Sequence, residues 1–286
     1  MSKLENRYQT FDVFGLIDVS RGDLPTRFSN VIRFSEASCI ALGLNRGQPH
    51  LFHQYGDIAM SYAIRECEGY EHYAMFDDDV DFARDGAAFC NQLAETLHSR
   101  HQDIDFLGLD YKYCPAEQGY GIALRKLLPQ RLMYYAYYPF VLLSARAANF
   151  IFAMRQLEFA KGLSMEKRVM CEGFVPSMLK AAGFKCFDLN EIIPGCYSKE
   201  NMILQYSGHG LPMSAKMELP DSEQMLHAVY SEEEFLRKLV AKFVVNGRPD
   251  WAQIRNVLIG PSGKSISTTK LNEFFSKNTV DILNLR

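Results

Sequence analysis

Apolar and polar positions alternate along the first half of the chain in the manner of strands and helices that follow one another. Apolar runs typical of strands cover residues 11–18, 40–44, 72–76 and 104–109. Between them, apolar residues at helical spacing cover 28–35, 55–67 and, behind a capping Asp85, the segment to Leu97. This order predicts an α/β fold with a largely parallel central sheet that is flanked by helices.

The second half of the chain is less regular. Residues 111–129 favour a loop or small hairpin, 134–143 predict a strand, and 184–189 predict another. Ser144 is placed to cap a helix that ends near Gln156.

Two further helical features follow towards the C-terminus. A short helix is predicted from about residue 170, with Gly183 as its stop signal. Amphipathic helices, with a capping box at 231–234, dominate beyond residue 214. The pattern therefore predicts a domain over residues 1–214 and a C-terminal helical extension over residues 215–286.

Three consecutive carboxylates, Asp77, Asp78 and Asp79, follow the apolar run at 72–76, and Asp81 comes soon after. Adjacent like charges resist ionisation unless a positive charge lies among them. A hard divalent cation such as Mn²⁺ or Mg²⁺ meets this need, since it takes oxygen ligands and keeps positions open for substrate phosphates. Ligands also bind at the carboxyl ends of strands in α/β sheets. A solvated acidic turn is the alternative interpretation, because Asp is common in turns.

Residues 76–80, Phe-Asp-Asp-Asp-Val, resemble the aspartate (DxD) motif of glycosyltransferases with the GT-A fold, in particular the fringe-like type. The resemblance implies a Rossmann-like sheet with a nucleotide-sugar half to about residue 110 and an acceptor half over 111–214. It further implies that Asp77 and Asp78 contact the nucleotide sugar. Asp79, together with Asp77, would bind a metal that bridges the donor diphosphate.

A second acidic element lies at a spacing that suits the same family. Glu172 is 93 residues beyond Asp79, and Gly183 is 11 residues beyond Glu172. This segment resembles the family's element in which an acid opens a short helix that ends in Gly, although Cys171 stands where a first Glu is usual. The resemblance implies that Glu172 is the general base for the acceptor hydroxyl. A carboxylate stabilised by the helix dipole is the structural alternative.

The remaining site residues rest on the resemblance alone. Many members of the family complete the metal shell with a histidine after the last core strand, which favours His209 between two glycines. A surface histidine in a glycine-rich loop is the alternative. The loops after the first two predicted strands would meet the nucleotide, although solvated loop charge explains them equally well. The residues concerned are Asp18, Ser20, Arg21, Asn45 and Arg46.

Composition bears on the partners and the cellular compartment that we expect for this protein. The 286 residues carry a net charge of −3, which offers no overall footprint for nucleic acid or an anionic membrane. The polar N-terminus predicts no signal peptide, and no apolar run approaches the roughly 18 residues of a membrane span. The seven cysteines lack CxxC spacing, which favours reduced, mostly buried thiols in a cytoplasmic protein.

These features together predict a cytoplasmic, metal-dependent glycosyltransferase. By the resemblance, it would move a sugar from a UDP-sugar to a glycan or lipid-linked glycan with inversion, in surface polysaccharide biosynthesis. We expect no transmembrane segment, but a peripheral membrane contact is compatible with such an acceptor. Two alternatives stay open, namely a sugar-nucleotide nucleotidyltransferase and a non-catalytic protein that binds nucleotide sugars or acts as a scaffold.

Overall fold

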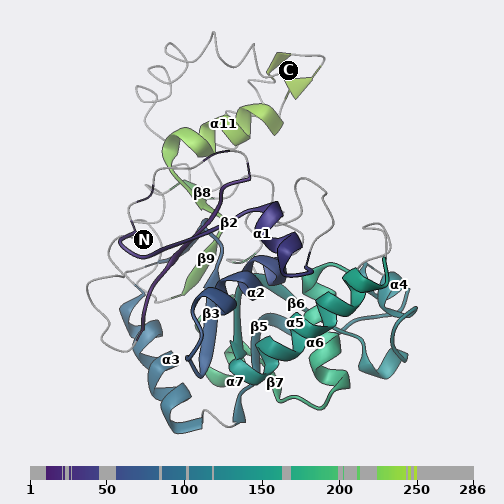
Figure 1. The fold of residues 1–286 in the computed structure, drawn as a ribbon. Helices are drawn as coiled ribbons and strands as arrows, with labels where there is room; N and C mark the ends of the chain where they lie inside the picture. Colours follow the sequence, from purple (N-terminus) through teal and green to yellow (C-terminus); the bar gives the residue numbers. More distant parts are fainter. Residues whose placement is uncertain are drawn as a thin grey trace. The chain divides into compact units, whose positions relative to one another are not determined.

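The computed structural model describes most of the first 198 residues and parts of the remainder (Figure 1). The described residues are 11–20, 22, 26, 28–44, 56–83, 86–100, 103–117, 119–162, 169–198, 202, 211–212, 224–242, 244–245 and 248–249. Contacts divide the chain into two compact units. The first unit comprises Met1–Asp78 and Ala87–Cys196, and the second comprises Asp79–Gly86 and Tyr197–Arg286. The predicted boundary at residue 214 lies outside the described residues.

The first unit is built on a four-stranded central sheet. Its strands, in spatial order, are β3 (His72–Phe76), β6 (Tyr134–Ser144), β5 (Phe106–Tyr113) and β7 (Cys186–Asp188). β6 is antiparallel to both β3 and β5, whereas β5 and β7 are parallel. Three of the four strands therefore point the same way, and β6 opposes them because it returns directly beside the preceding strand. The predicted α/β class is confirmed, with a mixed sheet.

Helices pack around this sheet, and four of them were predicted, although the helix capped by Ser144 ends at Ala160 and not near Gln156. They are α2 (Gly56–Glu66), α3 (Ala87–Arg100), α4 (Tyr120–Leu124), α5 (Ala145–Ala160), α6 (Cys171–Ala181) and α7 (Leu189–Ile192), with a 3-10 turn, η2, at Gln130–Leu132. The Ser144 side chain accepts a hydrogen bond from the amide of Ala147 and caps α5, as expected. Gly183 follows α6 with a φ of +81°, a conformation that favours glycine at a helix stop. α4 lies within the segment for which a loop or hairpin was expected.

Two expectations near the N-terminus are wrong. The segment at 28–35 was expected to be helical, but it contains β2 (Val31–Phe34), which pairs in parallel with β1 (Gly15–Asp18). The segment at 40–44 was expected to be a strand, but α1 (Glu36–Ala41) runs into it. Ser35 explains both errors, because its side chain forms a capping box with Ser38 and so starts a helix immediately after β2.

A buried arginine holds several helices of the first unit together. The Nε of Arg155, in α5, donates to Asp57 in α2 at 2.6 Å, and its Nη1 donates to Glu158 at 2.6 Å. Its Nη2 also donates to the carbonyl of Val169, just before α6. Burial lowers the pKa of Arg155, but the nearby carboxylates outweigh this effect and raise it, so the guanidinium stays charged.

Among its described residues, the second unit contains short strand pairs and one helix. β4 (Val80–Phe82) pairs with β9 (Met225–His227), β8 (Leu211–Pro212) with β10 (Val229–Tyr230), and β11 (Val244–Val245) with β12 (Arg248–Pro249). Helix α11 (Glu232–Lys242) begins at the predicted cap, where the hydroxyl of Ser231 accepts from the amide of Glu234. Phe235 and Leu239, on its predicted apolar face, are buried. The predicted helix at 271–285 lies outside the described residues.

Two further expectations concern the cysteines and the membrane. All seven cysteines are free thiols, and five of them are buried. Within the described part of the chain, no helix has the length and apolar character needed to cross a bilayer.

Replacement of Arg155 by Met should destabilise the first unit by about 3–5 kcal/mol, because Asp57 and Glu158 would be left buried without a counter-charge. Urea unfolding followed by circular dichroism measures this loss. Arg65→Met is the matched control, since Arg65 is one-third exposed and its partner Glu68 more so. The control should lose about 1 kcal/mol or less. Equal losses in the two variants would contradict the structural role of Arg155.

Candidate metal centre

The strand β3 fixes the backbone position of the first residue of the acidic motif, Asp77. Its last residue, Phe76, pairs with Phe140 in β6, and the two rings lie 4.9 Å apart. The amide of Asp77 then donates to the carbonyl of Pro139 at 2.9 Å, which extends the strand pairing by one residue. Asp77 therefore stands at the carboxyl end of β3 with its backbone held and its side chain exposed.

The pairing of β4 with β9 brings a distant histidine to Asp79. Val80 is the register partner of His227, and the amide of Val229 donates to the carbonyl of Asp79 at 2.8 Å. Burial drives this pairing, because Val80, Phe82 and Met225 are all buried in the second unit. The residues on either side of Asp79 and His227 are thus fixed by backbone hydrogen bonds.

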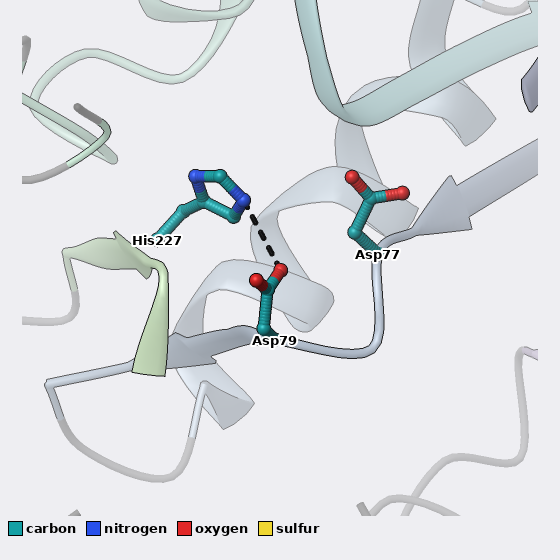
Figure 2. Close-up of side chains that lie close together, drawn as sticks. All are labelled: Asp77, Asp79 and His227. Atoms are coloured by element: carbon teal, nitrogen blue, oxygen red, sulfur yellow. Dashed lines mark ion pairs between the residues drawn. The ribbon is translucent and has the colours of Figure 1, made fainter. Parts of the chain in front are cut away.

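Asp77, Asp79 and His227 form a cluster of three side chains suited to a metal ion. Figure 2 shows Asp77 and Asp79 on the turn between β3 and β4, and His227 on β9. One ligand atom from each residue lies within 4.8 Å of the other two. Nε2 of His227 is 3.1 Å from Oδ1 of Asp79. Adjacent ligands of an octahedral ion at about 2.1 Å lie about 3.0 Å apart, so this separation fits a shared cation.

The contact of the second ring nitrogen of His227 indicates where the imidazole carries its proton. Nδ1 lies 3.2 Å from the carbonyl oxygen of Met202. A carbonyl only accepts, so Nδ1 carries the proton in this hydrogen bond. A neutral imidazole then presents a lone pair at Nε2, and this lone pair faces a carboxylate oxygen. Such an arrangement needs either a second proton or a cation between the two atoms, as in metal-bound histidines whose other nitrogen is fixed by a carbonyl.

The surroundings of Asp79 favour its charged form. Burial is the strongest influence and raises its pKa, but hydrogen bonds from His227 and Tyr230, with the charges of His227 and Lys238, bring the pKa below its usual value. The side chain of Asp79 is 19% exposed, compared with 4% for His227. A charged, half-buried carboxylate beside a buried imidazole is a suitable ligand pair for a divalent ion.

Helix α11 contributes to the same network. The ammonium of Lys238 lies 3.6 Å from the centroid of the Tyr230 ring, and it also pairs with Glu234 at 3.3 Å. Tyr230 in turn hydrogen-bonds Asp79. Burial lowers the pKa of Lys238, but Tyr230 and Glu234 more than compensate and raise it, so Lys238 remains positively charged. This charge offsets part of the negative charge of the acidic motif.

The other predicted site residues are placed separately. Asp18 ends β1 and Ser20 follows it. The amide of Ser20 donates to the Asp18 carboxylate at 2.8 Å, and the hydroxyl of Ser20 accepts from the amide of Glu36. Asp78 is exposed, and Glu172 is half-buried in the first turn of α6. The predicted residues that lie outside the described part of the chain are Arg21, Asn45, Arg46 and His209.

The sequence reasoning missed His227, which was assigned to the helical extension. A signal was present, because His227 interrupts the apolar run Met225-Leu226-His227-Ala228-Val229-Tyr230. A histidine within a buried strand needs polar partners, and a metal ion or a carboxylate can supply them. The pairing partner of this strand, however, lies about 145 residues earlier in the chain, and sequence pattern alone does not identify it.

The fold and the cluster together define an α/β protein with a candidate Asp–Asp–His metal centre. Comparison of the chain with protein-family models, with curated proteins and with solved structures finds no match. The site must therefore be interpreted from its own geometry and chemistry.

Replacement of His227 by Ala should weaken Mn²⁺ binding by more than about tenfold, because a direct ligand has at least the effect of the residues that orient ligands. Isothermal titration calorimetry measures the affinity. His98→Ala is the control, since His98 is exposed in the last turn of α3. Unchanged Mn²⁺ affinity in His227→Ala would mean that His227 and Asp79 form an ion pair only.

Proposed function

We propose that this chain is a metal-dependent glycosyltransferase of the GT-A, fringe-like type. It would transfer a sugar from a UDP-sugar to a glycan or lipid-linked glycan, with inversion at the anomeric carbon, in surface polysaccharide biosynthesis. The observation that carries the proposal is the cluster of Asp77, Asp79 and His227 at the end of a sheet strand. An Asp-x-Asp pair joined by one histidine has the ligand types and open side that a cation bound to a diphosphate requires.

The position of α6 supports Glu172 as the base. Burial raises the pKa of the neighbouring Cys171 to about 12, and the charge of Asp57 adds to this effect, with a further contribution from Asp77. The carboxylate of Asp77 therefore acts electrostatically on the residue that precedes Glu172. This contribution is smaller than those of burial and Asp57, and it is compatible with a base near the donor site.

The first turn of α6 suits a reactive carboxylate. Glu172 is half-buried, and the amides at a helix N-terminus favour negative charge there. α6 is tied to the sheet, since the hydroxyl of Ser177 donates to the carbonyl of Tyr134 and accepts from its amide. Arg155 fixes the approach to the helix through the carbonyl of Val169. Glu172 is thus held on a rigid element, as a general base must be.

The chemistry follows from these roles. A bound Mn²⁺ or Mg²⁺ would neutralise the diphosphate as Lewis acid and template. Asp77, Asp79 and His227 would hold that ion, and Asp77 and Asp78 would contact the nucleotide sugar. Glu172 would take the proton of the acceptor hydroxyl. The hydroxyl oxygen would bond to the anomeric carbon as the bond from that carbon to the diphosphate breaks. The nucleoside diphosphate leaves with the electron pair, and a single displacement inverts the configuration.

The predicted nucleotide side has support from the end of β1. Ser20, two residues beyond β1, links this loop to the start of α1, since its hydroxyl accepts from the amide of Glu36. Asp18 and Ser20 are both exposed, so they remain accessible to a ligand. In the proposal they contact the base and ribose, together with Arg21, Asn45 and Arg46.

Asp79→Asn should abolish metal-dependent turnover, whereas Glu172→Gln should bind the donor normally and lower kcat by about 10²–10⁴-fold, the typical contribution of a general base. Released nucleoside diphosphate reports turnover, and calorimetry reports donor binding. Asp81→Asn is the matched control, because Asp81 belongs to the same acidic segment but is not in the cluster. Turnover of Glu172→Gln at the wild-type rate would show that another group is the base.

A thermal-shift panel of nucleotide sugars, with and without Mn²⁺, should identify the donor. A ligand at about 100 times its Kd adds about 2.7 kcal/mol to the folded state, which gives a clear rise in Tm. The rise should require Mn²⁺ and should disappear in Asp79→Asn. Stabilisation by a nucleoside triphosphate and a sugar phosphate, with pyrophosphate release, would instead favour a nucleotidyltransferase. Stabilisation by a nucleotide sugar that is never consumed would favour a non-catalytic binding protein.

A further inference from the structure

The segment between β5 and β6, residues 114–133, leaves the central sheet, and we call it the excursion. It starts and ends at paired residues, since Tyr113 is the register partner of Tyr134 and the amide of Cys114 donates to the carbonyl of Met133 at 2.9 Å. Cys114, Leu124 and Met133 are buried in the core of the first unit. The excursion carries α4, which Figure 1 shows beyond the end of the central strands. Buried side chains therefore hold the excursion on the core of the first unit.

The outer side of this excursion is unusually apolar. Tyr113 is 41% exposed, Ile122 is 47% exposed and Leu127 is 45% exposed. Among the described residues, these three make up half of the six large hydrophobic side chains that are exposed. Leu124, between Ile122 and Leu127, is fully buried, so the segment contributes one apolar side chain to the core and exposes others to solvent.

Exposed basic residues occur in the same segment as these apolar residues. Arg125, Lys126 and Arg131 are all exposed, and none of them forms an ion pair within the described part of the chain. The segment 113–131 holds these three basic residues and a single acidic one, Glu117, although the whole chain carries a net charge of −3. The overall balance therefore conceals a local positive surface. We call these six residues, Tyr113, Ile122, Arg125, Lys126, Leu127 and Arg131, the 113–131 surface.

We propose that the 113–131 surface docks the protein on an anionic lipid surface. Aliphatic tips that enter the acyl boundary, a tyrosine at headgroup depth and arginine or lysine facing lipid phosphates are the groups that interfacial proteins use. Each basic residue close to an anionic leaflet strengthens binding by about fivefold. We choose an anionic membrane as the occupant because it offers Ile122 and Leu127 an apolar phase and offers the three basic residues lipid phosphates.

This proposal does not depend on sugar transfer. It concerns residues of the excursion and not those of the metal centre, so a protein without glycosyltransferase activity would still bind lipid through them. If the proposed function also holds, the surface would place the enzyme where lipid-linked acceptors are found. Failure of either proposal leaves the other to be tested independently.

Co-sedimentation with vesicles tests the proposal. The full chain should bind vesicles of phosphatidylcholine mixed with phosphatidylglycerol, and bind weakly to phosphatidylcholine alone. Added salt should release it, because screening weakens the attraction of the basic residues to the surface. The variant Lys126→Gln with Leu127→Ser should lower the partition coefficient by on the order of tenfold or more, since it removes one charge and one apolar tip.

The matched control is Lys161→Gln with Leu157→Ser. This variant removes the same two residue types from another exposed place, at the end of α5, where Leu157 is 52% exposed. It should bind vesicles as the unchanged chain does. Circular dichroism and Tm of both variants should match those of the unchanged chain, which shows that the fold persists.

Three outcomes would overturn the proposal. The first is that the unchanged chain does not bind anionic vesicles, and the second is that the two double variants lose binding equally. The third is that the chain forms a dimer that Lys126→Gln with Leu127→Ser dissociates, without binding vesicles. In that last case the 113–131 surface would be an interface between two copies of the chain.

Discussion

The first unit depends on the buried guanidinium of Arg155. From α5 it reaches Asp57 in α2 and the backbone just before α6, and it lies 3.7 Å from the ring of Phe174 within α6. A single charged group therefore sets the relative positions of three helices. Burial of such a charge is costly, and it is tolerated because two carboxylates, a carbonyl and an aromatic face meet it in good geometry. The position of Glu172 depends on this arrangement, because it lies in the first turn of the helix that Arg155 contacts.

The acidic motif also places a charged side chain in a largely buried position, but different groups surround this charge. Asp79 is largely buried, and its negative charge must also be met. His227, Tyr230 and Lys238 surround it with a ring nitrogen, a hydroxyl and an ammonium group. A carboxylate oxygen of Asp77 also lies within 4.8 Å of the ligand atoms of Asp79 and His227. The first cluster, around Arg155, joins one cation to two carboxylates, whereas the second, around Asp79, joins two carboxylates to one imidazole. This difference makes the second cluster suited to an exchangeable cation.

Local features of the fold could be predicted from the sequence because they depend on neighbouring residues. Ser144 and Ser231 cap helices because their side chains accept hydrogen bonds from nearby backbone amides. Gly183 ends α6 because it adopts a positive φ. Asp77 and Asp79 could be identified for a related reason, since consecutive carboxylates after an apolar strand are unusual within one short segment. The error at β2 and α1 is also local. Apolar residues at 28–35 fit both periodicities, and the cap at Ser35 decided between them.

Features that depend on strand pairing over long distances could not be predicted in the same way. The reversal of β6 in the sheet and the contact of His227 with Asp79 both follow from pairings whose partners are far apart in the sequence. A shift of β9 by one residue would turn His227 away from Asp79, so the candidate site depends on register as much as on residue type. Backbone pairing decided by buried Val80, Phe82 and Met225 therefore determines which histidine meets the acidic motif. The chemistry of this site is specified by hydrophobic residues that never contact a ligand.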